Sequence, residues 1–124
     1  MLRAIILVGI GGGLGSIFRF LTTVGINKYF QSAFPWATFA ANIIGCLIIG
    51  LLLGFFERYQ LTNPDLKYLF VTGFCGGYTT FSAFASENMN LFQSGNILTA
   101  FMYIAASILV GLFAVWIGLL LTKM

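Results

Sequence analysis

The stretch GFCGGYTTFSAFASE, residues 73–87, places glycines, hydroxyls, phenylalanines and a carboxylate inside an otherwise apolar chain. Two adjacent glycines and two adjacent threonines within it, Gly76–Gly77 and Thr79–Thr80, favour a local interruption of a helix, and such a break frees backbone carbonyls. Lipid cannot hydrogen-bond to these carbonyls, whereas a cation held at a protein interface can coordinate them. The stretch therefore predicts a helix break near residues 76–80 with a capacity for binding a cation.

The phenylalanines of this stretch could do a second kind of chemistry. Phe81 and Phe84 are three residues apart, so they share a face of the helix that resumes after the break. A phenyl ring has a positive edge, and rings presented edge-on can contact an anion while shielding it from water. Ordinary packing is the alternative, because the chain has 14 phenylalanines. Glu87 is expected to cap or pair near the membrane surface, outside any anion path.

Polar residues elsewhere in apolar segments suggest the same chemistry. A guanidinium facing lipid at the bilayer centre would cost roughly 2.5–3.5 kcal/mol, so Arg19 either lines an anion vestibule or snorkels to the interface. Asn42 either joins helices or donates its amide to a passing anion. Hydroxyls in the last apolar segment recur every four residues, about 6 Å apart on one helical ridge that a small anion could follow. With a closing glycine, this ridge comprises Thr99, Tyr103, Ser107 and Gly111.

The elements that must position these residues are membrane helices. Of 124 residues, 60% are hydrophobic and only 7% charged, with a mean hydropathy of +1.00, far from the composition of a soluble domain. We expect an all-α membrane protein with four transmembrane helices in a single domain, residues 1–124, because an apolar run of roughly 20 residues spans a bilayer. The expected spans are residues 4–25, 36–56, 66–93 (with the break near 76–80) and 97–122.

Small residues four positions apart predict close helix packing. The first span carries Gly9/Gly13, Gly11/Gly15 and Gly12/Ser16, and the second carries Gly50/Gly54. The glycine-rich run that contains the first three pairs lacks the third glycine of a dinucleotide-binding fingerprint and any βαβ context. We therefore interpret these glycines as a packing feature.

Several function classes are disfavoured by composition. The chain has no histidine and no pairing of residues suited to acid–base or nucleophilic catalysis, so an enzyme is not expected. Its six basic residues are scattered singly, which gives no nucleic-acid-binding stripe. Cys46 and Cys75 lie in apolar spans, where a cysteine is typically a small hydrophobic residue.

Charge and size bear on orientation and assembly. Four basic residues are expected on the side that holds both termini, namely Arg3, Arg58, Lys67 and Lys123, against Lys28 alone on the other side. This bias favours termini in the cytoplasm. A four-helix bundle fills its own interior, so conduction would require an oligomer, most simply a two-fold dimer.

The string GFCGGYTTFSAF, together with Arg19 after a glycine-rich start, Asn42 within the second span and four spans in a chain of this length, resembles the Fluc (CrcB) fluoride channels of bacteria. The resemblance covers essentially the whole chain. It implies an antiparallel, dual-topology homodimer in the bacterial cytoplasmic (inner) membrane, with two pores for passive fluoride export and a structural sodium ion at its centre. Ala83 stands where some relatives have a hydroxyl residue.

The resemblance also implies roles for individual residues. The sodium ligands would be the backbone carbonyls of Gly76 and Thr79. The anion pathway would comprise Arg19, Asn42, Thr80, Phe81, Ser82, Phe84, Tyr103 and Ser107, of which Tyr103 and Ser107 rest on spacing alone.

Three alternatives remain open at the level of sequence. The biased basic residues would also suit one half of an obligate pair of homologous chains with fixed opposite orientations. A small dual-topology secondary transporter would need an intramembrane carboxylate for coupling, for which Glu87 is the candidate. In a non-conducting structural subunit, the polar residues would only join helices.

Overall fold

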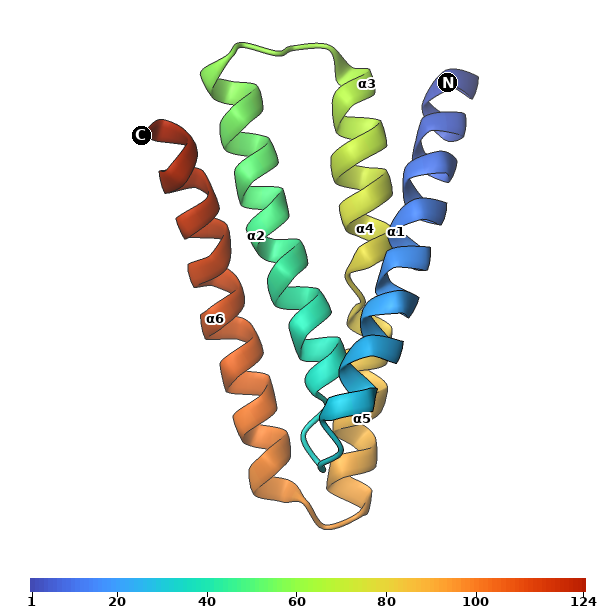
Figure 1. Ribbon diagram of the computed structural model, residues 1–124, viewed down its shortest axis with the longest axis vertical. Helices are drawn as coiled ribbons and strands as arrows, with labels where there is room; N and C mark the ends of the chain where they lie inside the picture. Colours follow the sequence, from blue (N-terminus) through green and yellow to red (C-terminus); the bar gives the residue numbers. More distant parts are fainter.

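A computed structural model describes residues 1–124 as helices that run up and down along one axis (Figure 1). Three of them are long and apolar enough to cross a membrane: α1 (Leu2–Tyr29), α2 (Trp36–Arg58) and α6 (Ile97–Lys123). The third crossing is built from shorter pieces in sequence, α3 (Pro64–Leu66), the π-helix η1 (Lys67–Cys75), α4 (Gly76–Tyr78) and α5 (Phe81–Gln93). The predicted all-helical fold with an interrupted third crossing is confirmed.

The interruption lies at Thr79 and Thr80, whose backbones are extended, with φ/ψ of −87°/159° and −151°/119°. Thr79 still hydrogen-bonds back to the Cys75 carbonyl, through its backbone N–H at 3.0 Å and its hydroxyl at 2.8 Å. Gly76 keeps helical angles of −63° and −36°. The glycines expected to open the helix therefore belong to its last turn, and the two threonines form the break.

The π-helix η1, which precedes α4 and the break, had no sequence signal. It spans Lys67–Cys75, so hydrogen bonds of the i→i+5 type carry the chain from the polar loop to the last helical turn. Its glycine, Gly73, faces Gly11 of α1 and is buried. Helices of this type are rare and concentrate at functional sites, so the π-helix favours a functional site in or next to this crossing.

Glycines set the spacing of two helix pairs. On α1, a Cβ at Gly11 would meet the Leu69 carbonyl, and one at Gly15 would meet the Phe74 carbonyl. On the second pair, a Cβ at Gly118 of α6 would lie 2.7 Å from the Leu47 carbonyl of α2. Backbone therefore touches backbone between α1 and η1–α4 and between α2 and α6, as the pairs Gly11/Gly15 and Gly50/Gly54 predict.

The pair Gly9/Gly13 behaves differently, because no atom outside α1 lies within 4 Å of a Cβ built at either residue. Both glycines are exposed on the outer face of α1. Within one subunit they make no helix contact.

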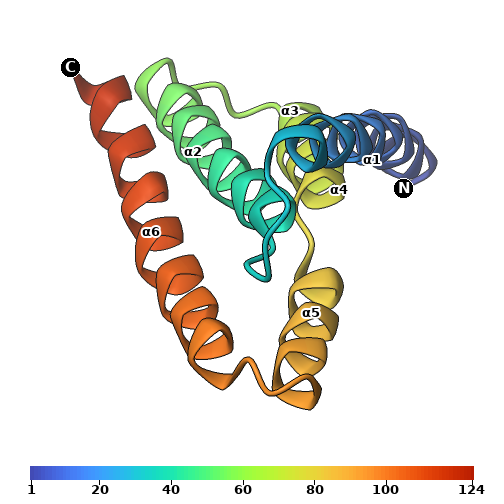
Figure 2. The same ribbon diagram turned by 60° about the horizontal axis from the view of Figure 1, so that its bottom comes forward.

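The third crossing changes its partner at the break. Above the break, η1 and α4 pack along α1; below it, α5 turns away from α1 and lies beside the N-terminal end of α6 (Figure 2). A small buried cluster of Leu91, Ala100 and Tyr103 forms there, with Phe34 and Phe84 packed against it. The break at Thr79 and Thr80 therefore connects a segment that packs on α1 to a segment that packs on α6.

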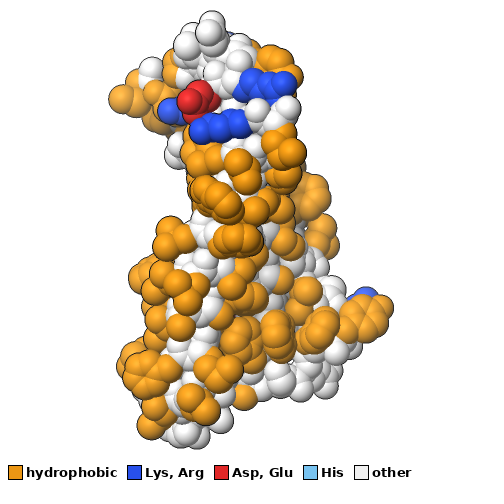
Figure 3. Space-filling view, turned by 90° about the vertical axis from the view of Figure 1, so that its left-hand side faces the viewer, with side chains coloured by type: hydrophobic (Ala, Val, Ile, Leu, Met, Phe, Trp, Pro, Cys, Tyr) orange, Lys and Arg blue, Asp and Glu red, His pale blue; other side chains and the backbone are white.

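The surface is that of a membrane protein. Only 19 of the 124 residues are buried, so most apolar side chains point outward and cover the sides of the molecule (Figure 3). The charged side chains seen in this view gather mainly at one end. The chain is a multi-pass membrane protein with no large interior of its own.

Candidate functional site

Asn42 of α2 holds the break by both ends of its amide. The Thr80 N–H donates to Asn42 Oδ1 at 2.8 Å, and Asn42 Nδ2 donates to the Thr80 carbonyl at 3.2 Å. The amide thus pairs with extended backbone as a neighbouring strand would. Since an amide NH₂ carries two N–H donors, one remains free after this pairing. Both interpretations of Asn42, a helix connector and a donor to a ligand, are therefore compatible with its geometry.

This clamp has a consequence for the helix above it. In a continuous helix the Thr80 N–H would donate to the Gly76 carbonyl, but here it donates to Asn42. The Gly76 carbonyl consequently loses its helical partner at the negative end of the η1–α4 segment. Below the break, the Thr80 hydroxyl accepts from the Ala83 N–H at 3.2 Å and caps α5, whose N-terminal end is positive.

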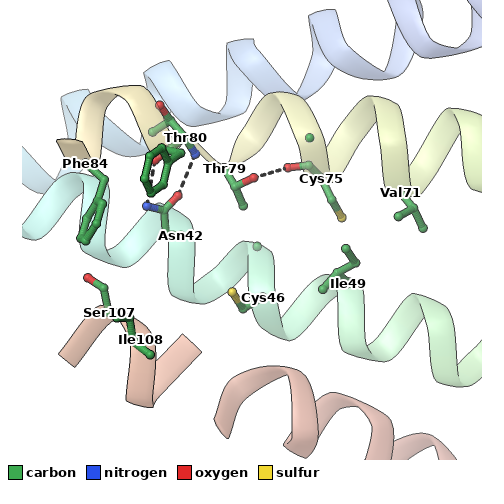
Figure 4. A pocket seen from close by; sticks show the side chains of 13 residues that line it. Asn42, Cys46, Ile49, Val71, Cys75, Thr79, Thr80, Phe84, Ser107 and Ile108 are labelled. Carbon is green, nitrogen blue, oxygen red and sulfur yellow. Dashed lines mark hydrogen bonds between the residues drawn. The ribbon is translucent and has the colours of Figure 1, made fainter. Parts of the chain in front are cut away.

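A cavity of about 420 Å³ lies beside the break, between α2, the third crossing and α6 (Figure 4). Seven of the ten residues that the sequence assigned to a site line it: Asn42, Gly76, Thr79, Thr80, Phe81, Phe84 and Ser107. The other lining residues are mainly apolar and include both cysteines, Cys46 and Cys75. The arrangement offers a few polar groups in a largely apolar surrounding.

The two phenylalanines of the stretch lie next to each other, with ring centroids 5.8 Å apart. Phe84 also packs against the ring of Tyr103, edge to face, at 4.9 Å and 61°. Phe81 differs sharply, because 79% of its surface is exposed although it lines the cavity beside the break. One ring is fixed by the subunit and the other projects beyond it.

Ser107 presents an unused hydroxyl to the cavity. Its Oγ is buried and forms no hydrogen bond. A buried hydroxyl without a partner carries a penalty of about 1–3 kcal/mol, so an acceptor that reached it would be stabilised there. On α6 it lies one turn above Tyr103, as the four-residue spacing requires.

Three of the predicted residues lie outside the cavity. The buried Nε of Arg19 has no partner, and Arg19 lies on the α1 face between Gly15, which contacts α4, and Thr22, whose hydroxyl is 2.8 Å from that of Tyr78. Ser82 is exposed and places its hydroxyl 3.4 Å from that of Thr80. Tyr103 is fully buried below the cavity.

A cluster around Glu87 was not anticipated from the sequence. Thr38 of α2 donates its hydroxyl to Glu87 Oε2 at 2.7 Å, and Tyr103 of α6 donates to Oε1 at 2.9 Å. Glu87 therefore pairs, as expected, but it does so between three helices and next to Phe84 rather than apart from the predicted path. The Tyr103 hydroxyl is committed to this carboxylate. One signal could have indicated the cluster, since Thr38 and Tyr103 each lie one turn below a cavity residue, Asn42 and Ser107.

Fold and site together define a small multi-pass membrane protein with a sparsely polar, partly aromatic cavity beside an interrupted helix. The chain belongs to the family described as "CrcB-like protein, Camphor Resistance (CrcB)", whose profile matches residues 6–119.

Curated relatives match over nearly their full length. The chain is 53% identical over 122 residues, 98% of both chains, to a protein of Flavobacterium psychrophilum named "Fluoride-specific ion channel FluC". Proteins of the same name from Azobacteroides pseudotrichonymphae and Phocaeicola vulgatus are 45% and 37% identical and are covered over 98% and 100% of their lengths. The resemblance inferred from the GFCGGYTTFSAF stretch is confirmed.

Proposed function

We propose that this chain is a fluoride-selective ion channel, not an enzyme, that lets fluoride leave the cell passively across the bacterial cytoplasmic membrane and so confers fluoride resistance. The observation that carries the proposal is the cavity at the break, where the free N–H of Asn42, the unused hydroxyl of Ser107 and the rings of Phe81 and Phe84 face one space. The names of the full-length relatives support the same assignment.

These groups suit fluoride because it is a small, strongly hydrated anion that accepts hydrogen bonds. Amide and hydroxyl donors replace part of its water shell, and the positive edges of the rings contact it while excluding water. Chloride is wider and fits such a path poorly. We assign the path to Arg19, Asn42, Thr80, Phe81, Ser82, Phe84, Tyr103 and Ser107, with Arg19 supplying positive potential from α1.

We infer that two copies assemble antiparallel to complete the path. The cavity is open on one side, and in a single subunit its polar groups would face lipid there. The exposed ring of Phe81 projects at the same place, where a second copy could cover it. A homodimer with dual topology is the simplest assembly. The bias of basic residues toward one end also suits a pair of homologous chains with fixed opposite orientations.

We further propose that a sodium ion lies between the two copies. Its ligands would be the carbonyls of Gly76, which has lost its helical donor, and Thr79, which is extended; both residues line the cavity. Carbonyl oxygens at the negative end of a helix are suited to an alkali ion. Bound there, the ion would satisfy these carbonyls and add positive potential beside the anion path.

Fluoride efflux from proteoliposomes, followed with a fluoride electrode, tests the proposal through matched variants. Phe84→Ile and Asn42→Ala should abolish fluoride efflux while the dimer persists in detergent. Phe20→Ile is the control, because Phe20 is 65% exposed on α1 and does not line the cavity at the break, and it should conduct like the parent chain. If Phe84→Ile and Asn42→Ala lost the dimer but retained flux per assembled dimer, these residues would only join helices, and the chain would be a structural subunit.

A secondary transporter is a second candidate because Glu87 lies between α2, α5 and α6, where a coupling carboxylate could act. This candidate predicts that Glu87→Gln abolishes a flux driven by a pH gradient while Phe81→Ile has no effect. The channel predicts the reverse for Phe81→Ile, together with fluoride efflux that needs no pH gradient.

A further inference from the structure

A second hollow, of about 830 Å³, lies at the membrane end of the molecule, away from the break. Its lining comes from the C-terminal end of α2, residues 60–63 of the loop that follows, Pro64 of α3 and Lys67 at the start of η1. Because α2 ends at Arg58, the hollow lies at the level of lipid headgroups. The residues on which the inference rests are Leu53, Phe56, Glu57, Gln60, Asn63 and Lys67.

The charges in this hollow are unpaired, unlike most of the charges near it. Outside the hollow, Arg3 forms an ion pair with Asp65 at 2.8 Å, and Arg58 donates to the Thr122 carbonyl at 2.9 Å. Glu57, on α2, and Lys67, at the start of η1, form no ion pair or hydrogen bond with each other or with another side chain. The end of the molecule that carries these charges is seen in Figure 3, where acidic and basic side chains are mixed.

The remaining lining matches an amphipathic ligand. Leu53, which is half-buried, and Phe56, which is buried, provide an apolar floor. Asn63 uses its Oδ1 to accept from the Asp65 N–H, which leaves its amide N–H groups free, and Gln60 adds a second free amide. A ligand that fits carries an anion for Lys67, a cation with N–H donors for Glu57, and hydrocarbon.

We propose that this hollow binds the headgroup of phosphatidylethanolamine, with the phosphate at Lys67 and the primary ammonium at Glu57. Phosphatidylcholine has the same charges, but its quaternary ammonium has no N–H to donate to the carboxylate. Phosphatidylglycerol lacks a cation and would leave Glu57 unpaired beside the phosphate. The proposal does not depend on which ion the protein conducts.

Lipid retention measured by native mass spectrometry tests the site. Full-length protein reconstituted in vesicles of equal parts phosphatidylethanolamine, phosphatidylcholine and phosphatidylglycerol would be extracted and its bound lipids counted. We expect about threefold enrichment of phosphatidylethanolamine over each of the others, as for an exposed, charge-assisted contact. Equal retention of all three lipids, or no retained lipid because a second copy of the chain covers the hollow, would overturn the proposal.

Variants at the two charges sharpen the test. Glu57→Gln should remove the preference for phosphatidylethanolamine over phosphatidylcholine, and Lys67→Met should lower retention of all three lipids. Lys123→Met is the matched control, since Lys123 carries the same charge at the same membrane end but does not line the hollow. An unchanged preference in Glu57→Gln, with the dimer intact, contradicts the assignment, as does an equal effect of Lys123→Met.

Discussion

The two halves of the third crossing are held in place by different physics. Above the break, η1 and α4 lie against α1 with glycine facing backbone, as at Gly15 and Gly77, and the hydroxyls of Thr22 and Tyr78 add one hydrogen bond to this close packing. Below the break, α5 packs on α6 through a small apolar cluster, the Thr80 hydroxyl caps its first turn, and hydroxyls from α2 and α6 converge on Glu87. The upper half is therefore a platform placed mainly by close backbone contact, whereas in the lower half hydrogen bonds next to the proposed ion path add to apolar packing.

The largest expected effect comes from breaking the platform. Gly15→Val would drive a side chain into the Phe74 carbonyl, and overpacking against backbone costs about 1–3 kcal/mol or prevents assembly. We expect little folded dimer by size-exclusion chromatography in detergent. Gly13→Val is the matched control, because a side chain at Gly13 on the open face of α1 meets no atom within one subunit. If Gly13→Val lost as much folded dimer as Gly15→Val, the contact of Gly15 with backbone would not be the cause.

The next effect concerns the junction between the two halves. Asn42→Ala leaves the N–H and the carbonyl of Thr80 without partners, at a total cost of about 1–3 kcal/mol because Thr80 is only half-buried. We expect faster hydrogen exchange at the Thr80 amide together with loss of fluoride efflux. Asn90→Ala, an exposed amide on the same lower half, provides the comparison. Slow exchange at Thr80 in Asn42→Ala would show that the clamp does not hold the break.

A smaller effect is expected in the lower half. Tyr103→Phe keeps the ring that packs on Phe84 and removes only the hydroxyl that donates to Glu87, a bond to a charged group worth about 1.5–3 kcal/mol. Thermal unfolding of the dimer should show less stability in Tyr103→Phe, and a double-mutant cycle with Glu87→Ala should show coupling. Additive losses in that cycle would mean that the two residues act independently.

The smallest effect concerns the turns that enter and leave this crossing. Gln60 adopts a positive φ of 53° after α2, and Gly95 adopts 85° after α5. Since a non-glycine residue pays about 1–2 kcal/mol for this conformation, Gln60→Gly should raise thermal stability and Gly95→Ala should lower it. Shifts of the same sign for both variants would show that backbone strain is not the determining factor.

The sequence allowed the break, the pairing of Phe81 with Phe84 and the close glycine contacts to be predicted, because each depends on residues near one another in the chain. The clamp of Asn42 on Thr80 could not be placed, since its partner is a backbone peptide and leaves no residue-type signal. The π-helix was not predicted for a similar reason, because the spacing of apolar residues does not reveal whether backbone hydrogen bonds skip four residues or five.

The Glu87 cluster escaped prediction for a different reason. Its three members come from three helices, and their common depth follows only once those helices are aligned. Its position next to Phe84 also adds a contact that spacing did not indicate, because the Tyr103 hydroxyl donates to this carboxylate. Composition and spacing therefore do not predict which polar residues of a membrane protein will meet when they come from segments far apart in the sequence.

The central claim is that the cavity at the break selects fluoride, and the ratio of fluoride to chloride efflux from proteoliposomes of the unmodified chain tests it most directly. Both ions would be measured with ion-selective electrodes under the same driving force, with protein-free vesicles as the baseline. We predict fast fluoride efflux and chloride efflux at the baseline rate. Equal rates for the two ions, or fluoride efflux no faster than from protein-free vesicles, would contradict it.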